Sequence, residues 1–217
     1  MLKALLLVFS VLLSGCQMFQ KQKKASDGIF TSICDRTEQV AQAILNQLNK
    51  TDCKKTTKEE LSSIVGLDLA HKNLTQLKQG DFSDLSSLRW LQLSDNKISR
   101  IPAGLFSGLS SLEGLHLSGN RIKSVSAGLF SGLSSLRELY LSNNKISRIP
   151  AGLFSGLSSL RRLHLSNNEI SYIPAGLFSG LSSLQRLYFF KNRLKESKSK
   201  TKMNMKIRLN EKANIYF

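Results

Sequence analysis

The sequence has few of the residues on which several protein classes depend. Its 217 residues include only three cysteines and three prolines, too few for a disulfide-rich scaffold or a proline-rich chain. Its longest apolar run, residues 4–13, is about half as long as a membrane-spanning helix. Acidic residues are also scarce, at 15 against 31 basic ones. These shortages exclude a polytopic membrane protein and favour a globular or repeat protein.

The formal net charge of +16 is unevenly distributed along the chain. Residues 191–217 alone carry 9 basic and 2 acidic side chains, almost half of the excess. A charge concentrated in a tail says less about a binding surface than a basic face would. The high net charge therefore does not indicate a nucleic-acid partner, and no such partner is expected.

The first sixteen residues have the pattern of an export signal. Lys3 provides a positive start, the apolar run 4–13 follows, and the run ends in the tetrapeptide LSGC at Cys16. This tetrapeptide resembles the lipobox of bacterial lipoproteins, which implies cleavage before Cys16 and a lipid on its thiol. Membrane attachment through the acylated Cys16 would follow. The alternative is an ordinary secretory signal with a chance cysteine.

The same resemblance divides the N-terminal region. Residues 1–15 are expected to be the signal peptide, and the polar, lysine-containing residues 16–29 a tether. Because Gln17 rather than Asp follows the cysteine, the resemblance implies a lipid-anchored protein at the bacterial outer membrane or cell surface.

A 24-residue unit dominates the rest of the chain. Four copies share the segment AGLFSGLSSL, the first copy is divergent, and the sixth is partial. The copies begin at Leu67, Leu91, Leu115, Leu139, Leu163 and Leu187. They resemble the "typical" 24-residue class of leucine-rich repeat, LxxLxLxxNxLxxLPxxxFxxLxx. The resemblance implies an α/β repeat solenoid, a horseshoe with short parallel strands on its concave face, over residues 67–194.

Each recurring position has a physical role. Leu91 and Leu93 alternate with Gln92, the period-two mark of a short strand with one buried face. A phenylalanine recurs behind each strand and is expected to form a buried spine. An asparagine recurs at each bend, where an amide can both donate to and accept from inward-facing backbone groups. This predicted structural ladder comprises Asn96, Asn120, Asn144, Asn168 and Asn192.

Both ends of a solenoid need covers, because otherwise their cores would be wet. Residues 30–66 are predicted to form a helical N-terminal cap, with capping boxes at residues 35–38 and 57–60. Cys34 and Cys53 bracket the first of these helices. In an exported protein they most simply pair, the alternative being two free thiols.

No cap pattern is recognised at the other end. Residues 195–217 form a basic tail that either is disordered, covers the last repeat, or replaces further repeats through a change of reading frame. The sequence does not choose among these.

The outward positions of the strands are the candidate binding surface, because leucine-rich repeat proteins generally bind on the concave side. Stacking the repeats at about 4.8 Å places histidines and tyrosines in one column, with arginines beside them, a composition that interface centres favour. The predicted partner-binding residues are Arg89, Trp90, Gln92, His116, Arg137, Tyr140, Arg161, Arg162, His164, Arg186 and Tyr188.

Charge is expected to be partly neutralised on this face. Glu113 with Arg137, and Glu138 with Arg162, are opposite-charge neighbours on adjacent repeats. Within the columns of residues stacked from repeat to repeat, however, Arg161, Arg162 and Arg186 are counted as having no acidic neighbour. They are therefore expected to remain available to a partner.

Catalysis is not expected, nor is a cofactor or metal. His116 and His164 are two strands apart, at about 10 Å, with Tyr140 between them, which is too far for one zinc ion. The many serines belong to the repeat. The sequence favours an exported, lipid-anchored protein that binds another protein through its concave face. The alternatives are an electrostatic binder of anionic polymers (glycosaminoglycan, lipopolysaccharide or nucleic acid) that uses the arginines and tail, and a structural envelope protein.

Overall fold

The computed structural model describes residues 32–194 and 214–216, which belong to one compact unit, Thr31–Phe217. The predictions for the signal peptide, the tether and Cys16 lie outside the described residues, as do residues 195–213 of the basic tail. Among the helices of the described ranges, none has the length and apolar character to cross a membrane.

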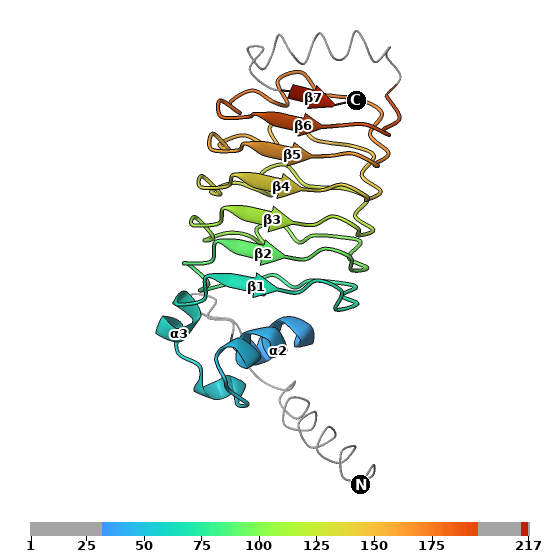
Figure 1. The fold of residues 1–217 in the computed structure, drawn as a ribbon. Coiled ribbons are helices and arrows are strands. Elements are labelled where there is room, and N and C mark those ends of the chain that lie inside the picture. Colours follow the sequence, from blue (N-terminus) through green and yellow to red (C-terminus); the bar gives the residue numbers. More distant parts are fainter. Residues whose placement is uncertain (1–31, 195–213, 217) are drawn as a thin grey trace. The chain divides into compact units, whose positions relative to one another are not determined.

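A small helical cap precedes the first strand (Figure 1). Its elements are the 3-10 turn η1 (Ile33–Asp35), helix α2 (Glu38–Gln47), the 3-10 turn η2 (Cys53–Lys55) and the short helix α3 (Lys58–Ser62). Cys34 in η1 and Cys53 in η2 form a disulfide, with their Cα atoms 5.3 Å apart. The predicted pairing of Cys34 with Cys53 is therefore present. It closes the loop that contains α2.

Helix α2 is amphipathic, and its apolar side lies in the core. Its buried residues are Val40, Ala41, Ile44 and Leu45. The capping box predicted at residues 35–38 is wrong, because Asp35 belongs to η1 and the residue before the helix is Thr37, which makes no side-chain cap hydrogen bond. The second predicted box is confirmed. The Thr57 side chain accepts from the Glu60 N–H, and the Glu60 carboxylate accepts from the Thr57 N–H.

The cap is joined to the first repeat through a buried polar cluster. Arg36 donates from Nη1 to the Asp81 carbonyl at 2.8 Å and from Nη2 to the Ser83 carbonyl at 2.7 Å. Both carboxylate oxygens of Asp81 accept from Thr37, one from its N–H and one from its hydroxyl, each at 2.7 Å. Burial lowers the pKa of Arg36, and the carboxylates of Asp84 and Asp81 oppose that shift. The other full repeats have leucine at the position of Asp81, so this divergence of the first repeat is what fits it to the cap.

Seven short strands form one parallel sheet in chain order (Figure 1). They are β1 (Gly66–Asp68), β2 (Trp90–Gln92), β3 (Gly114–His116), β4 (Glu138–Tyr140), β5 (Arg162–His164), β6 (Arg186–Tyr188) and β7 (Asn214–Tyr216). From β1 to β6 each strand pairs with the equivalent strand of the next repeat, as in Leu67 with Leu91. This register confirms the parallel-strand solenoid predicted from the repeat.

The core runs the length of the sheet and consists of leucines with a spine of phenylalanines behind them. Successive rings of the spine stack with centroids 6.1–6.4 Å apart and are at most 1 % exposed. The spine comprises Phe82, Phe106, Phe130, Phe154 and Phe178. Because each repeat can bury its apolar side only against its neighbours, the strands are stable only as a stack.

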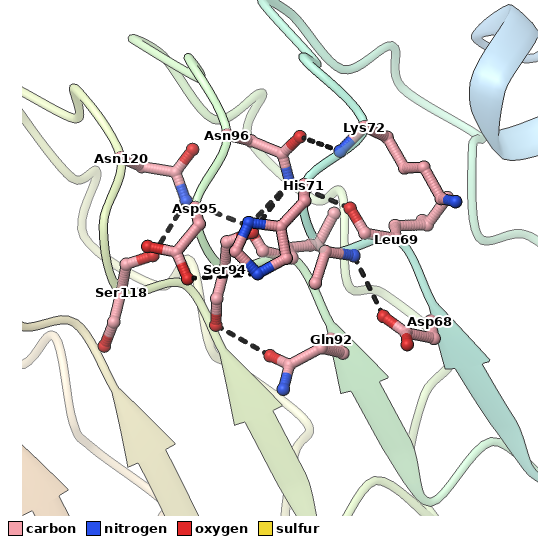
Figure 2. A network of polar contacts seen from close by, with 12 residues as sticks. Asp68, Leu69, His71, Lys72, Gln92, Ser94, Asp95, Asn96, Ser118 and Asn120 are labelled. Atoms are coloured by element: carbon pink, nitrogen blue, oxygen red, sulfur yellow. Dashed lines mark hydrogen bonds and ion pairs between the residues drawn. The ribbon is translucent and has the colours of Figure 1, made fainter.

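The recurring asparagines satisfy backbone groups at the bends that follow the strands. In Figure 2, the Asn96 amide nitrogen donates to the carbonyl of Leu69, and its amide oxygen accepts from the N–H of Lys72. Asn144 likewise donates to the Leu117 and Leu141 carbonyls and accepts from the Ile122 N–H. An aliphatic side chain at these bends would leave several buried polar groups without partners.

Strand β7 lies at the end of the basic tail and pairs with β6, which agrees with one of the three alternatives predicted for the tail, a cover over the last repeat. It does not keep the spacing of the earlier pairs, since Leu187 lies opposite Ile215 and Tyr188 opposite Tyr216. Ile215 is buried. The end of the basic tail therefore covers part of the last repeat with a seventh strand.

Candidate functional site

The outward positions of the strands form one continuous surface, here called the strand face. In each of β2 to β6 the middle leucine is fully buried, and the residue after it is only partly buried. The pairing register places these half-buried residues side by side in one column. The column is Asp68, Gln92, His116, Tyr140, His164, Tyr188 and Tyr216.

Five aromatic side chains of this column stack on one another and are here called the ring stack. They are His116, Tyr140, His164, Tyr188 and Tyr216. In chain order, the successive ring centroids lie 4.4, 4.4, 4.1 and 4.6 Å apart. Because the ring faces cover one another, the edges are left for contact with solvent or a partner.

Trp90 lies beside the ring stack at its N-terminal end. Its ring centroid is 6.4 Å from that of His116, and the residue is 45 % exposed. The indole occupies the space over Gly114, where a Cβ would overlap the Cε3 and Cζ3 atoms of Trp90. Glycine at the start of β3 is therefore what lets the indole lie flat against the strand face.

Two glutamates neutralise most of the arginines of the strand face. Glu113 lies between Arg89 and Arg137, at 3.5 and 3.3 Å from their guanidinium nitrogens. Glu138 accepts a hydrogen bond of 2.8 Å from the Tyr140 hydroxyl and forms an ion pair with Arg162.

The expectation that Arg162 remains available is therefore wrong. Arg162 lies opposite Glu138 across the β4–β5 pair, and the two side chains meet. Arg161 and Arg186 form no ion pair with any other residue of the described ranges, and both are exposed.

Packing within the ring stack shifts the ionisation of its members. Desolvation lowers the pKa of His116, opposed by the negative charge of Glu138. Desolvation also lowers the pKa of His164, an effect that Arg162 and His116 reinforce and Glu138 opposes. The pKa of Tyr140 is raised, first by desolvation and then by its hydrogen bond to Glu138. Both histidines therefore favour the neutral form at pH 7.

The column predicted from the repeats is present as far as Tyr188, whereas Tyr216 was not predicted to belong to it. The repeat period breaks before Tyr216, so stacking by repeat number did not reach it. The signal that could have found it is the tripeptide NIY, which repeats the apolar-then-tyrosine pattern of Leu187 and Tyr188. Glu138 was noted only as a charge partner, whereas it also holds the Tyr140 hydroxyl.

The strand face presents ring edges and paired charges to its surroundings. Within the described part of the chain, no group of three or more His, Cys, Asp or Glu side chains is placed to hold a metal ion. A shallow polar hollow beside the strands is lined by serines and by the Arg89–Glu113–Arg137 group, without a histidine.

Comparisons with known proteins agree with this architecture. The leucine rich repeat family model matches residues 45–98, 91–146 and 134–194. No curated protein matches the chain. A solved structure of a leucine-rich repeat protein from Leptospira interrogans is similar, with a TM-score of 0.60 and 31 % identity over 73 % of this chain. The chain spans 38 % of the length of that relative.

Leucine-rich repeat proteins are generally binding scaffolds, and most bind other proteins. The family model covers well over half of this chain, and its matched residues include the parallel strands β1 to β6. The chain therefore belongs to the leucine-rich repeat family.

Proposed function

We propose that this protein binds another protein through the strand face, as a rigid preformed surface without catalysis. The observation that carries the proposal is the ring stack, in which five half-buried or exposed rings form an unbroken file across the sheet. Rings that are already packed lose little conformational freedom when a partner binds. Aromatic side chains of this kind supply most of the binding free energy in many interfaces.

The orientation of the rings favours a protein over a sugar as the partner. A sugar would stack on an exposed ring face, whereas the four inner contacts of the stack cover those faces. The exposed edges carry tyrosine hydroxyls and imidazole nitrogens, which suit hydrogen bonds with a polypeptide. Trp90 adds a large apolar surface at one end of the file.

The ion pairs between arginines and glutamates argue against a binding site for a polyanion on the strand face. Arg89, Arg137 and Arg162 each have a carboxylate within ion-pair distance. The charge available to an anionic polymer there is therefore smaller than a count of arginines suggests. No observation favours a purely structural role in the envelope.

The test uses single substitutions in the purified full chain. Tyr140→Ala removes the ring at the centre of the file, and a captured binding partner should lose at least roughly tenfold in affinity. Tyr172→Ala is the matched control, because Tyr172 is 68 % exposed and makes no ring contact within the described ranges. Calorimetry or surface plasmon resonance with the captured partner measures both. Equal affinities for the two variants would contradict the proposal.

The protein is further proposed to be exported and lipid-anchored at the outer membrane or cell surface, with repeats of the typical 24-residue class. The supporting observations are the LSGC tetrapeptide at Cys16 and the disulfide, since disulfides persist in oxidising compartments. Cys16→Ser should abolish incorporation of radiolabelled palmitate and release the protein from membranes. Labelling of that variant would reject the anchor.

A further inference from the structure

A second surface of the solenoid carries cations without partners. It lies on the segments that follow the bends after β2, β3 and β4, and each of these three repeats contributes two basic side chains. The surface, here called the exit flank, comprises Lys97, Arg100, Arg121, Lys123, Lys145 and Arg148. All six are exposed.

Backbone pairing stacks these residues from repeat to repeat. The Arg121 N–H donates to the Ile98 carbonyl, and the Lys145 N–H donates to the Ile122 carbonyl. Further along the segment, Ser124 and Arg148 form a parallel β-bridge. Neighbouring repeats are therefore about 4.8 Å apart here, as in the sheet. Three residues along an extended segment span only about 10 Å.

The exit flank carries six cations over three adjacent repeats and no acidic residue at these positions. None of its six cations is in an ion pair with another residue in 32–194 or 214–216. An acidic residue fits these positions, because Glu169 occupies the same place in the next repeat and pairs with Arg193 at 3.3 Å. In the first repeat, the corresponding residues Asn73, Thr75 and Gln76 are neutral. The positive surface is thus confined to three adjacent repeats.

The charges lie close enough to act together. The separations of about 5–10 Å are close to one Debye length at physiological ionic strength, so six positive charges add to one local potential. A linear polyanion laid along the stack would meet two cations at every repeat.

We propose that the exit flank is a binding site for a linear acidic polysaccharide, held by its sulfate or carboxylate groups. One exposed aromatic side chain, Tyr172, occupies the place of Arg148 in the next repeat, at the edge of the flank, so no row of rings accompanies the cations on which successive nucleobases could stack. Contact along the flank therefore rests on the anionic groups. Exposed serines between the cations, Ser99 and Ser147, add hydroxyl donors. A flat anionic membrane would also meet Glu169 and the neutral first repeat, whereas a narrow chain fits the confined stack. This site is independent of the strand face.

The test compares two triple variants of the full chain with the same net charge. Lys97→Gln, Arg121→Gln and Lys145→Gln remove one cation from each repeat of the exit flank. The control, Lys198→Gln, Lys200→Gln and Lys202→Gln, removes three cations from the basic tail. The probe is heparin, with neutral dextran as a blank, and binding is measured by calorimetry at several salt concentrations.

The wild-type chain is expected to bind heparin, and the flank variant to bind at least roughly tenfold more weakly than the tail variant. Its slope of log K against log salt should also be shallower by about 2, since each lost contact removes about 0.7–0.9. Absence of heparin binding, or an equal or greater loss in the tail variant, overturns the proposal. So does tighter binding to single-stranded DNA or to vesicles of anionic lipid than to heparin. Unchanged melting curves show that both variants are folded.

Discussion

The strand face and the exit flank are made by the same repeats, yet they distribute charge in opposite ways. On the strand face two acidic residues, Glu113 and Glu138, each lie beside arginines of neighbouring repeats and pair with them. On the exit flank, three successive repeats carry cations only. Nearly identical repeats can therefore build two different surfaces, because only a few outward positions vary while the core positions stay constant.

The two surfaces also differ in how firmly their side chains are held in place. The strand face has stacked rings and bridging glutamates, which hold its side chains in place before any partner binds. The side chains of the exit flank make no ion pair or ring contact within the described ranges. The first surface suits a partner of fixed shape, and the second suits a flexible chain recognised by its charge.

Reversing one charge on the strand face is expected to lower the free energy of unfolding more than reversing one on the exit flank. Glu138→Lys removes the acceptor of the Tyr140 hydroxyl and places a cation beside Arg162, which should lower the free energy of unfolding by about 1–3 kcal/mol. Lys145→Glu on the exit flank should change it by less than about 0.5 kcal/mol, because Lys145 is exposed and unpaired within the described ranges. Urea denaturation measures both. Similar losses in the two variants would show that the surfaces do not differ as described.

Lowering the pH should have a smaller effect, confined to the strand face. Desolvation holds the pKa of His116 and of His164 below the ordinary 6.5. Between those lowered values and 6.5, the unfolded chain binds more protons than the folded chain. The stabilisation is therefore complete above pH 6.5 and is lost as the pH falls through the lowered values.

A variant with His116→Gln and His164→Gln should lose less stability between pH 7.5 and pH 5 than the wild-type chain. Denaturant midpoints at the two pH values measure the loss. His71→Gln is the control, because His71 lies outside the ring stack and 75 % of its side chain is exposed. A double variant with the same pH dependence as wild type would show that the ring stack does not perturb the histidines.

The fold was predictable from the sequence because a single repeat period fixes the strands, the core and their register together. The central column followed from the same period up to Tyr188. Tyr216 did not follow, because the segment before it breaks the period. The contacts of Arg36 with Asp81 were also beyond reach, since they join residues 45 positions apart and no local pattern marks them.

The exit flank was missed for a different reason. Counted by segment along the chain, the positive charge is concentrated in the basic tail, which hides the cations spread over the repeats. Only the stacking of repeats brings Lys97, Arg121 and Lys145 into one column. The contacts of Glu138 were also beyond prediction from the sequence. Whether its carboxylate contacts Tyr140, Arg162 or both depends on side-chain geometry.

The buried cluster around Asp81 has a consequence for how the chain folds. Repeats as alike as those from Leu91 onward can exchange places during folding, and a strand that pairs one repeat out of step would still bury leucine against leucine. Thr37 finds a buried carboxylate, that of Asp81, only in the first repeat, because leucine occupies the equivalent place in the other full repeats. The cap thus fixes which repeat comes first, because a chain that starts one repeat late would leave the buried N–H and hydroxyl of Thr37 without their acceptor and the buried Arg36 without the nearby charge of Asp81.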